Sequence, residues 1–150
     1  MRNPTRRNAP SKKVWSRRCA AQALYEWQLT GGEPAWIAAG FLAHQDLGKA
    51  DLEYFRELVG EIPLHVAEID AALAPFLDRP LAQVDPVECA ILRIGGYELM
   101  KRPEINHRVA INEAVELAKM FGAEQGHRFV NGVLDKLART VRPGEFTQPS

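Results

Sequence analysis

The chain has 150 residues, 46% of them hydrophobic and 25% charged, and its 19 basic and 19 acidic residues give a formal net charge of zero. This length and composition fit one globular domain with a core of its own and exclude a disordered chain. No run approaches the ~20 apolar residues of a membrane span, and no apolar segment follows the basic N-terminus as in a secretory signal, so we expect a cytoplasmic protein.

The balanced total hides a strong asymmetry at the N-terminus. Residues 1–18 contain seven basic residues and no acid, so the rest of the chain is net acidic by the same amount. Such a segment favours a polyanion as partner, because lysine and arginine bind phosphates. The alternative is a solubilising tail without a partner. We expect residues 1–12 to form a disordered basic arm.

The N-terminal half predicts helices separated by glycine and proline. Apolar residues recur at spacings of three and four from Val14 and stop at residues 30–34, which predicts the first helix. A second helix is predicted over about 35–47 and a third from about residue 51, where Pro63 either kinks one long helix or separates two. Several aromatic residues fit core or near-core positions in these patterns: Trp15, Trp27, Trp36, Phe41, Phe55, Phe76 and Phe121.

The C-terminal half begins with a loop over residues 77–86 and a well-marked helix start. Asp85 can cap the helix, Pro86 fits its first turn, and Glu88 completes a capping-box pattern. The glycine pair at 95–96 predicts close approach of another helix. Helices are also predicted over about 108–121, closed by Gly122, and over about 124–141, with a tail over 143–150.

These patterns predict an all-α fold of about seven helices, because no segment alternates as a β-strand does. Catalysis is not expected, because the few serines are poorly placed and no glycine-rich phosphate loop follows a strand. The apolar helical patterns around Cys19 and Cys89 predict that both are buried thiols. The histidines at 44, 65, 107 and 127 lack metal-ligand spacing, so we expect no metal and no cofactor.

Two features point to RNA. Arg18, Gln22 and Tyr25 share one face of the first helix, a composition that suits phosphates and unpaired bases. The alternative for Tyr25 is a ring at the edge of the core. The second feature is a cluster of residues at the start of the last helix. The free backbone N–H groups of a helix N-terminus can bind a phosphate there. The alternative is that the glycines of this segment serve only to allow another helix to cross closely. That cluster consists of His127, Arg128 and Phe129, within residues 124–132, where Gly126 and Gly132 are the glycines concerned.

Five blocks in fixed order carry a resemblance to a known family: RRCAAQALYEWQL, DLEYFRELVGEI, CAILRIGGYEL, VAINEAVELAKMFG and HRFVNGVLDKLAR. Together they make residues 13–142 resemble the NusB family of bacterial transcription antitermination factors. The resemblance implies an RNA-binding helical domain of two packed sub-bundles. It also implies binding to single-stranded boxA-like RNA together with a ribosomal protein acting as NusE, within an RNA polymerase antitermination complex that suppresses termination, notably in ribosomal RNA operons.

The resemblance also implies roles for single residues. Lys13, Arg17 and Arg18 would contact phosphates, Tyr25 and Phe129 fall at positions of RNA contact, and Glu88 falls near the protein-partner surface. Gln125 stands where an acid is common in the family, which should weaken repulsion of RNA. Val14 and Trp15 interrupt the denser arginine run that is common there.

Two other interpretations stay open at this point. The domain also occurs fused to ribosomal RNA methyltransferases, and a protein-interaction bundle with a merely solubilising arm would belong to a different class. The sequence leaves a homodimer open.

Overall fold

A computed structural model describes residues 11–44 and 47–147, and all regular structure in these ranges is helical, which confirms the predicted all-α fold. The described part contains seven α-helices and three short 3-10 turns. The α-helices are α2 (Lys12–Thr30), α3 (Pro34–His44), α4 (Leu52–Leu64), α5 (Val66–Leu73), α6 (Pro86–Lys101), α7 (His107–Phe121) and α8 (Gly126–Val141); the turns are η1 (Ala74–Phe76), η2 (Leu81–Gln83) and η3 (Pro143–Glu145).

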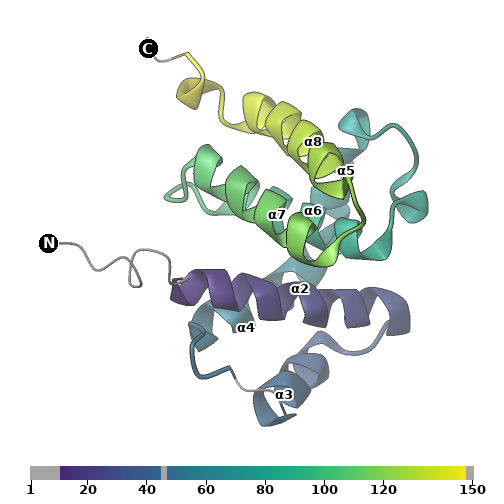
Figure 1. The fold of residues 1–150 in the computed structure, drawn as a ribbon, viewed down its shortest axis with the longest axis vertical. Coiled ribbons are helices and arrows are strands. Elements are labelled where there is room, and N and C mark those ends of the chain that lie inside the picture. Colours follow the sequence, from purple (N-terminus) through teal and green to yellow (C-terminus); the bar gives the residue numbers. More distant parts are fainter. Residues whose placement is uncertain (1–10, 45–46, 148–150) are drawn as a thin grey trace, which may run out of the picture.

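The helices form two sub-bundles that share one apolar core. In Figure 1, α3 and α4 lie below α2, while α5, α6, α7 and α8 pack together above it. Helix α2 joins the halves because it packs on α4 on one side and on α6 on the other. None of the helices in the described ranges is long and apolar enough to cross a membrane.

Short polar side chains set the helix starts. The Ser11 side chain accepts a hydrogen bond from the amide of Val14, so α2 already begins at Lys12, inside the predicted arm. Residues 1–10 of that arm lie outside the described part. Asp85 caps α6 as predicted. At the end of α2, Gly31 has a φ of 67°, a left-handed conformation that glycine adopts without strain.

Proline and glycine act where the sequence indicated. Pro63 lies in the last turn of α4, and a new helix follows, so this segment is two helices rather than one. A Cβ atom at Gly95 would lie 2.5 Å from a methyl carbon of Leu134 in α8, so the predicted close approach of another helix is confirmed. Gly122 does end α7, but with an extended φ of −87° rather than a left-handed one.

Three expectations from the pattern differ from the structure, and one of them concerns Cys19, which is half-buried rather than buried. Trp36, expected near the core, is 80% exposed, because α3 turns Ile37 inward and its neighbour therefore points away. Residues 143–147, expected as part of a tail, pack against the start of α7 through η3 and Phe146, whose ring centroid lies 4.3 Å from that of His107.

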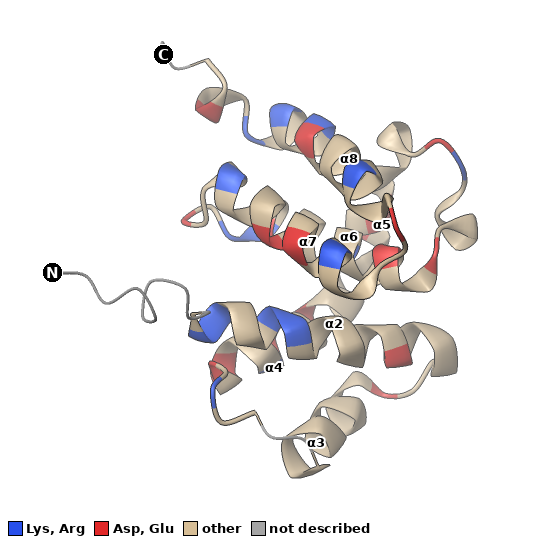
Figure 2. Ribbon diagram, viewed as in Figure 1, with Lys and Arg blue, Asp and Glu red and all other residues tan. Residues whose placement is uncertain are grey.

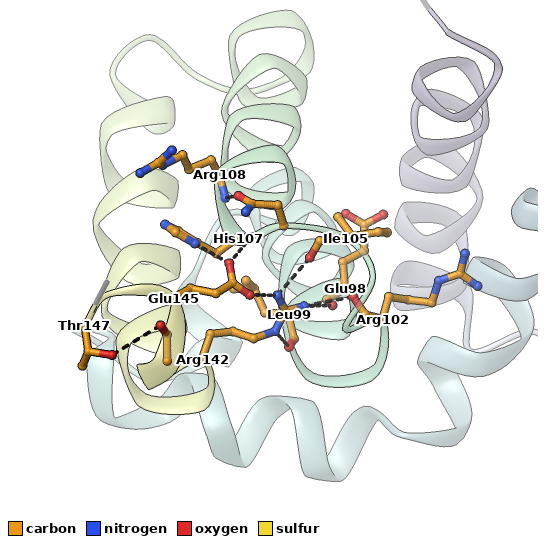
Figure 3. A network of polar contacts seen from close by, with 11 residues as sticks. Glu98, Leu99, Arg102, Ile105, His107, Arg108, Arg142, Glu145 and Thr147 are labelled. Atoms are coloured by element: carbon orange, nitrogen blue, oxygen red, sulfur yellow. Dashed lines mark hydrogen bonds and ion pairs between the residues drawn. The ribbon is translucent and has the colours of Figure 1, made fainter. Parts of the chain in front are cut away.

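Arg142 holds the end of α6 and the loop after it. Its guanidinium donates hydrogen bonds to the backbone carbonyls of Glu98, Leu99, Arg102 and Ile105, as Figure 3 shows. Carbonyls at a helix end have few backbone donors available to them, although those of Glu98 and Arg102 still accept from the amides of Arg102 and Ile105, so one arginine supplies further donors to several acceptors at once. The α6–α7 connection is thereby fixed from a position about forty residues further along the chain.

Candidate nucleic-acid interface

The exposed face of α2 carries an alternation of aromatic, basic and amide side chains. Trp15, Arg18, Gln22 and Tyr25 follow one another at spacings of three and four, which places them on one stripe of the helix. Gln22 is exposed and the other three are half-buried. The structure thus brings the predicted residues Arg18, Gln22 and Tyr25 to one surface.

Several cations at the start of this helix are not neutralised. Lys12, Lys13 and Arg18 have no ion-pair partner among the residues that the structure describes, although Lys13 lies with its Nζ atom 5.1 Å from the ring centre of Tyr54. Figure 2 shows the basic residues at the N-terminal half of α2 as a group. Unpaired cations beside partly exposed aromatic rings suit the phosphates and bases of RNA.

Arg17 is the exception, and its position contradicts the phosphate contact expected of it. The residue is only 4% exposed, and its Nε atom lies 2.8 Å from Oε2 of Glu98, which is fully buried in α6. The hydroxyl of Tyr54 in α4 also donates to this carboxylate. Arg17 therefore connects the two sub-bundles, because it lies on the same side of α2 as Ala20 and Leu24.

Burial and the neighbouring charges shift the pKa values of this buried pair. Burial raises the pKa of the Glu98 carboxyl, although the charge of Arg17 opposes that shift. Burial alone would lower the pKa of Arg17, but the carboxylate outweighs it and the pKa is raised. Burial followed by the charge of Glu98 also raises the pKa of Tyr54. A cation held this way is a structural group rather than a free phosphate ligand.

The second predicted cluster lies at the start of α8. Gln125 is exposed and has a φ of 74°, which is unusual for a residue other than glycine. Arg128 is exposed, while His127 and Phe129 are half-buried. The structure therefore does bring the residues of this cluster together at one helix end, where no side chain caps the helix among the described residues.

Glu88, expected as an exposed residue of the partner surface, is buried. It is 5% exposed, and its carboxylate lies against Gly126 and near the backbone amide of Ala123. Burial raises the pKa of this carboxyl, and the charge of Asp85 adds to that shift. The first turn of α6 faces the α7–α8 connection, so Glu88 packs within the chain instead of presenting its charge outward.

Two basic residues near these surfaces were not singled out in the sequence. The guanidinium carbon of Arg79 lies 4.6 Å from the ring centre of Phe129, and Nζ of Lys49 lies 5.2 Å from the ring centre of Trp15. Both residues are in loops, at positions without helical periodicity. Their proximity to an aromatic ring depends on how distant segments pack, so sequence spacing could not indicate it.

The two parts of the predicted interface lie on different elements. Helix α7 packs on both α2 and α8 and lies between them in Figure 1. An apolar hollow of about 690 Å³ lies elsewhere, between α2, α3 and α4. It does not suit phosphate. No group of histidine, cysteine and acidic residues in the described ranges could hold a metal ion.

Comparison with known proteins agrees with this architecture. The NusB family model matches residues 15–139. The transcription antitermination protein NusB of Nitrosococcus oceani is 56% identical over 136 residues, covering 91% of each chain, and that of Shewanella halifaxensis is 53% identical over 133 residues, covering 89% of this chain and 98% of the relative.

Solved structures show the same fold. NusB of T. maritima superposes with a TM-score of 0.76 at 25% identity, covering 99% of this chain and all of that one. A crystal structure of the antitermination factors NusB and NusE in complex with double-stranded RNA contains a chain with a TM-score of 0.78 at 27% identity, covering 85% of this chain and 96% of its own. On the family match and the close relatives, the chain belongs to the NusB family of transcription antitermination proteins.

Proposed function

We propose that this protein acts in the cytoplasm as an RNA-binding antitermination factor. It binds boxA-like nascent RNA together with a ribosomal protein of the NusE type, and this complex suppresses termination by RNA polymerase, notably in ribosomal RNA operons. Its role is to bind and to bridge, without catalysis. Family membership and the solved complex of relatives with NusE and RNA support this proposal.

The main observation that supports RNA binding is the set of side chains on the exposed face of α2. Lys12, Lys13 and Arg18 lack ion-pair partners in the described part of the chain, and Tyr25 lies on the same stripe as Arg18. Cations bind the backbone of any RNA, whereas a ring stacks only on bases that are unpaired. Single-stranded RNA is therefore the ligand that uses the whole face.

The proposed binding of a NusE-type ribosomal protein rests on the distribution of charge along the chain. Outside residues 1–18 the chain is net acidic, which suits a basic ribosomal protein. A protein that holds RNA and a second protein at once makes the second contact intramolecular and thereby raises the apparent affinity for RNA. Because Glu88 is buried, this partner surface must use other, exposed acids.

The test is a titration of labelled RNA with the full chain, alone and with a NusE-type ribosomal protein, at several salt concentrations. We expect a boxA-like single strand to bind more tightly than a duplex of the same sequence and the added partner to tighten it further. Equal affinity for unrelated single strands, with no gain from the partner, would contradict the proposal. In that case a protein-interaction bundle with a solubilising arm would be the better description.

A further inference from the structure

Packing in the hydrophobic core does not account for the surroundings of the Trp15 side chain. The sequence predicts a core or near-core position for it in the first helix, and in the structure it is half-exposed. The guanidinium carbon of Arg18 lies 4.7 Å from its ring centre, and Nζ of Lys49, from the loop between α3 and α4, lies 5.2 Å from it. The electron-rich face of an indole attracts cations at these distances.

Backbone contacts hold the loop of Lys49 against α2. The hydroxyl of Ser16 donates to the carbonyl of Asp51 at 2.7 Å, and the amide of Asp51 donates to the carbonyl of Lys12 at 3.3 Å. Ser16 is fully buried, so this junction is part of the folded body. Lys49 is thus fixed beside the start of α2 although the two are more than thirty positions apart in the chain.

The two cations over this ring carry uncompensated charge. Neither Arg18 nor Lys49 forms an ion pair with any residue that the structure describes. The carboxylate of Asp51 accepts a hydrogen bond from the amide of Tyr54 at the start of α4 and forms no ion pair with either cation. Both cations lie over one ring, within about a Debye length (~10 Å at 0.1 M salt), so they repel each other, and a bound anion would relieve this repulsion.

We propose that Trp15, Arg18 and Lys49 form a phosphate-binding clamp that extends the RNA path from α2 onto the α3–α4 loop. The inference rests on the proposed function, since the anion is a phosphate of the bound RNA. Trp15 holds both cations in place, so less side-chain freedom is lost when a phosphate arrives. The clamp lies about 15 Å along the helix from Tyr25, so one strand touches both only by spanning several nucleotides.

Salt titrations of three variants test the clamp. Lys49→Gln removes one phosphate contact and should reduce the slope of log affinity against log salt by about 0.7 for a single strand. Lys49→Arg keeps the charge and should retain the wild-type slope. Lys136→Gln is the matched control, because Lys136 is also exposed and has no ion-pair partner in the described residues but lies in the C-terminal half of α8.

A fourth variant tests the ring itself. Trp15→Leu keeps both cations but removes what holds them, so we expect an affinity about two- to five-fold lower with an unchanged salt slope. Thermal unfolding and circular dichroism of each variant show whether it is folded. If wild-type protein binds RNA while Lys49→Gln and Lys136→Gln both match its slope, the clamp is wrong and the proposed function stands. If wild-type protein binds no RNA, the proposed function itself fails.

Discussion

The carboxylate of Glu88 in α6 occupies the space where a side chain at Gly126 in α8 would begin. A Cβ atom at residue 126 would overlap this carboxylate, so glycine is required there by contact rather than by an unusual backbone conformation. The contact connects the first turn of α6 to the helix start that carries Gln125, His127 and Phe129. Asp85 alone of the predicted capping pair caps α6 in the described structure, while the carboxylate of Glu88 packs against the candidate RNA surface.

Substitution of Gly126 by alanine should be destabilising. The added methyl group displaces Glu88 and should lower the free energy of unfolding by about 1–3 kcal/mol, as overpacking does. Gly132→Ala is the control in the same helix, because nothing lies within 4 Å of its Cβ position. That change should instead stabilise the protein by roughly 0.5–1 kcal/mol, the usual gain of alanine over glycine in a helix. Denaturant unfolding compares the two, and equal stabilisation would show that Glu88 moves aside freely.

Substitutions of the adjacent residues Arg17 and Arg18 in α2 should have different effects on stability and on RNA binding. Arg17→Ala leaves the buried carboxylate of Glu98 unpaired and should cost roughly 3–5 kcal/mol of stability. Arg18→Ala should change stability by less than about 0.5 kcal/mol but reduce the salt slope of RNA binding by about 0.7. Unfolding curves and RNA titrations on both variants are the measurement. A stable Arg17→Ala variant with a reduced salt slope would restore the phosphate contact first expected of Arg17.

Tyr25 should contribute to binding of unpaired bases. Tyr25→Ala should cost roughly 1–3 kcal/mol of affinity for a single strand, because the ring no longer stacks on a base. Tyr25→Phe keeps the ring and should bind almost as wild type. Affinity for a duplex, whose bases are already stacked, should change little in either variant. A fall in melting temperature with unchanged single-strand affinity would assign the ring to packing.

Glu145 should make part of the stability depend on acid pH. A hydrogen bond from the backbone amide of His107, followed by contacts with the His107 ring and Arg142, lowers the pKa of Glu145 from 4.5 to about 2. Because the folded pKa lies below the unfolded one, this stabilisation is present above pH 4.5 and is lost as the pH falls through 2.

The difference in melting temperature between wild type and Glu145→Gln measures this contribution. It should be largest above pH 4.5 and shrink as the pH falls toward 2. Glu116→Gln, at an exposed position of α7, is the control and should show no comparable change. A difference that does not vary with pH would mean that the ionised carboxylate of Glu145 is not what holds η3 against α7.

The helices and several of their limits followed from the sequence because their causes are local. Asp85 caps α6 through amides two and three residues away, and apolar spacing identifies the buried side of each helix. The glycine pair at 95–96 signalled a close helix neighbour for a similar reason, since glycine inside a helix is costly without one. The resemblance to the NusB family likewise depended on residue types in order, and the family match confirms it.

Tertiary structure alone decided which polar residues face solvent. Arg17 and Arg18 are neighbours in one basic run, but Glu98, 81 positions further on, draws the first into the core. Glu88 is buried against the start of α8, a segment distant from it in the sequence. Lys49 lies near Trp15 only because its loop packs on α2. Periodicity gives the direction of a side chain around its own helix, whereas its partner depends on which distant segment packs there.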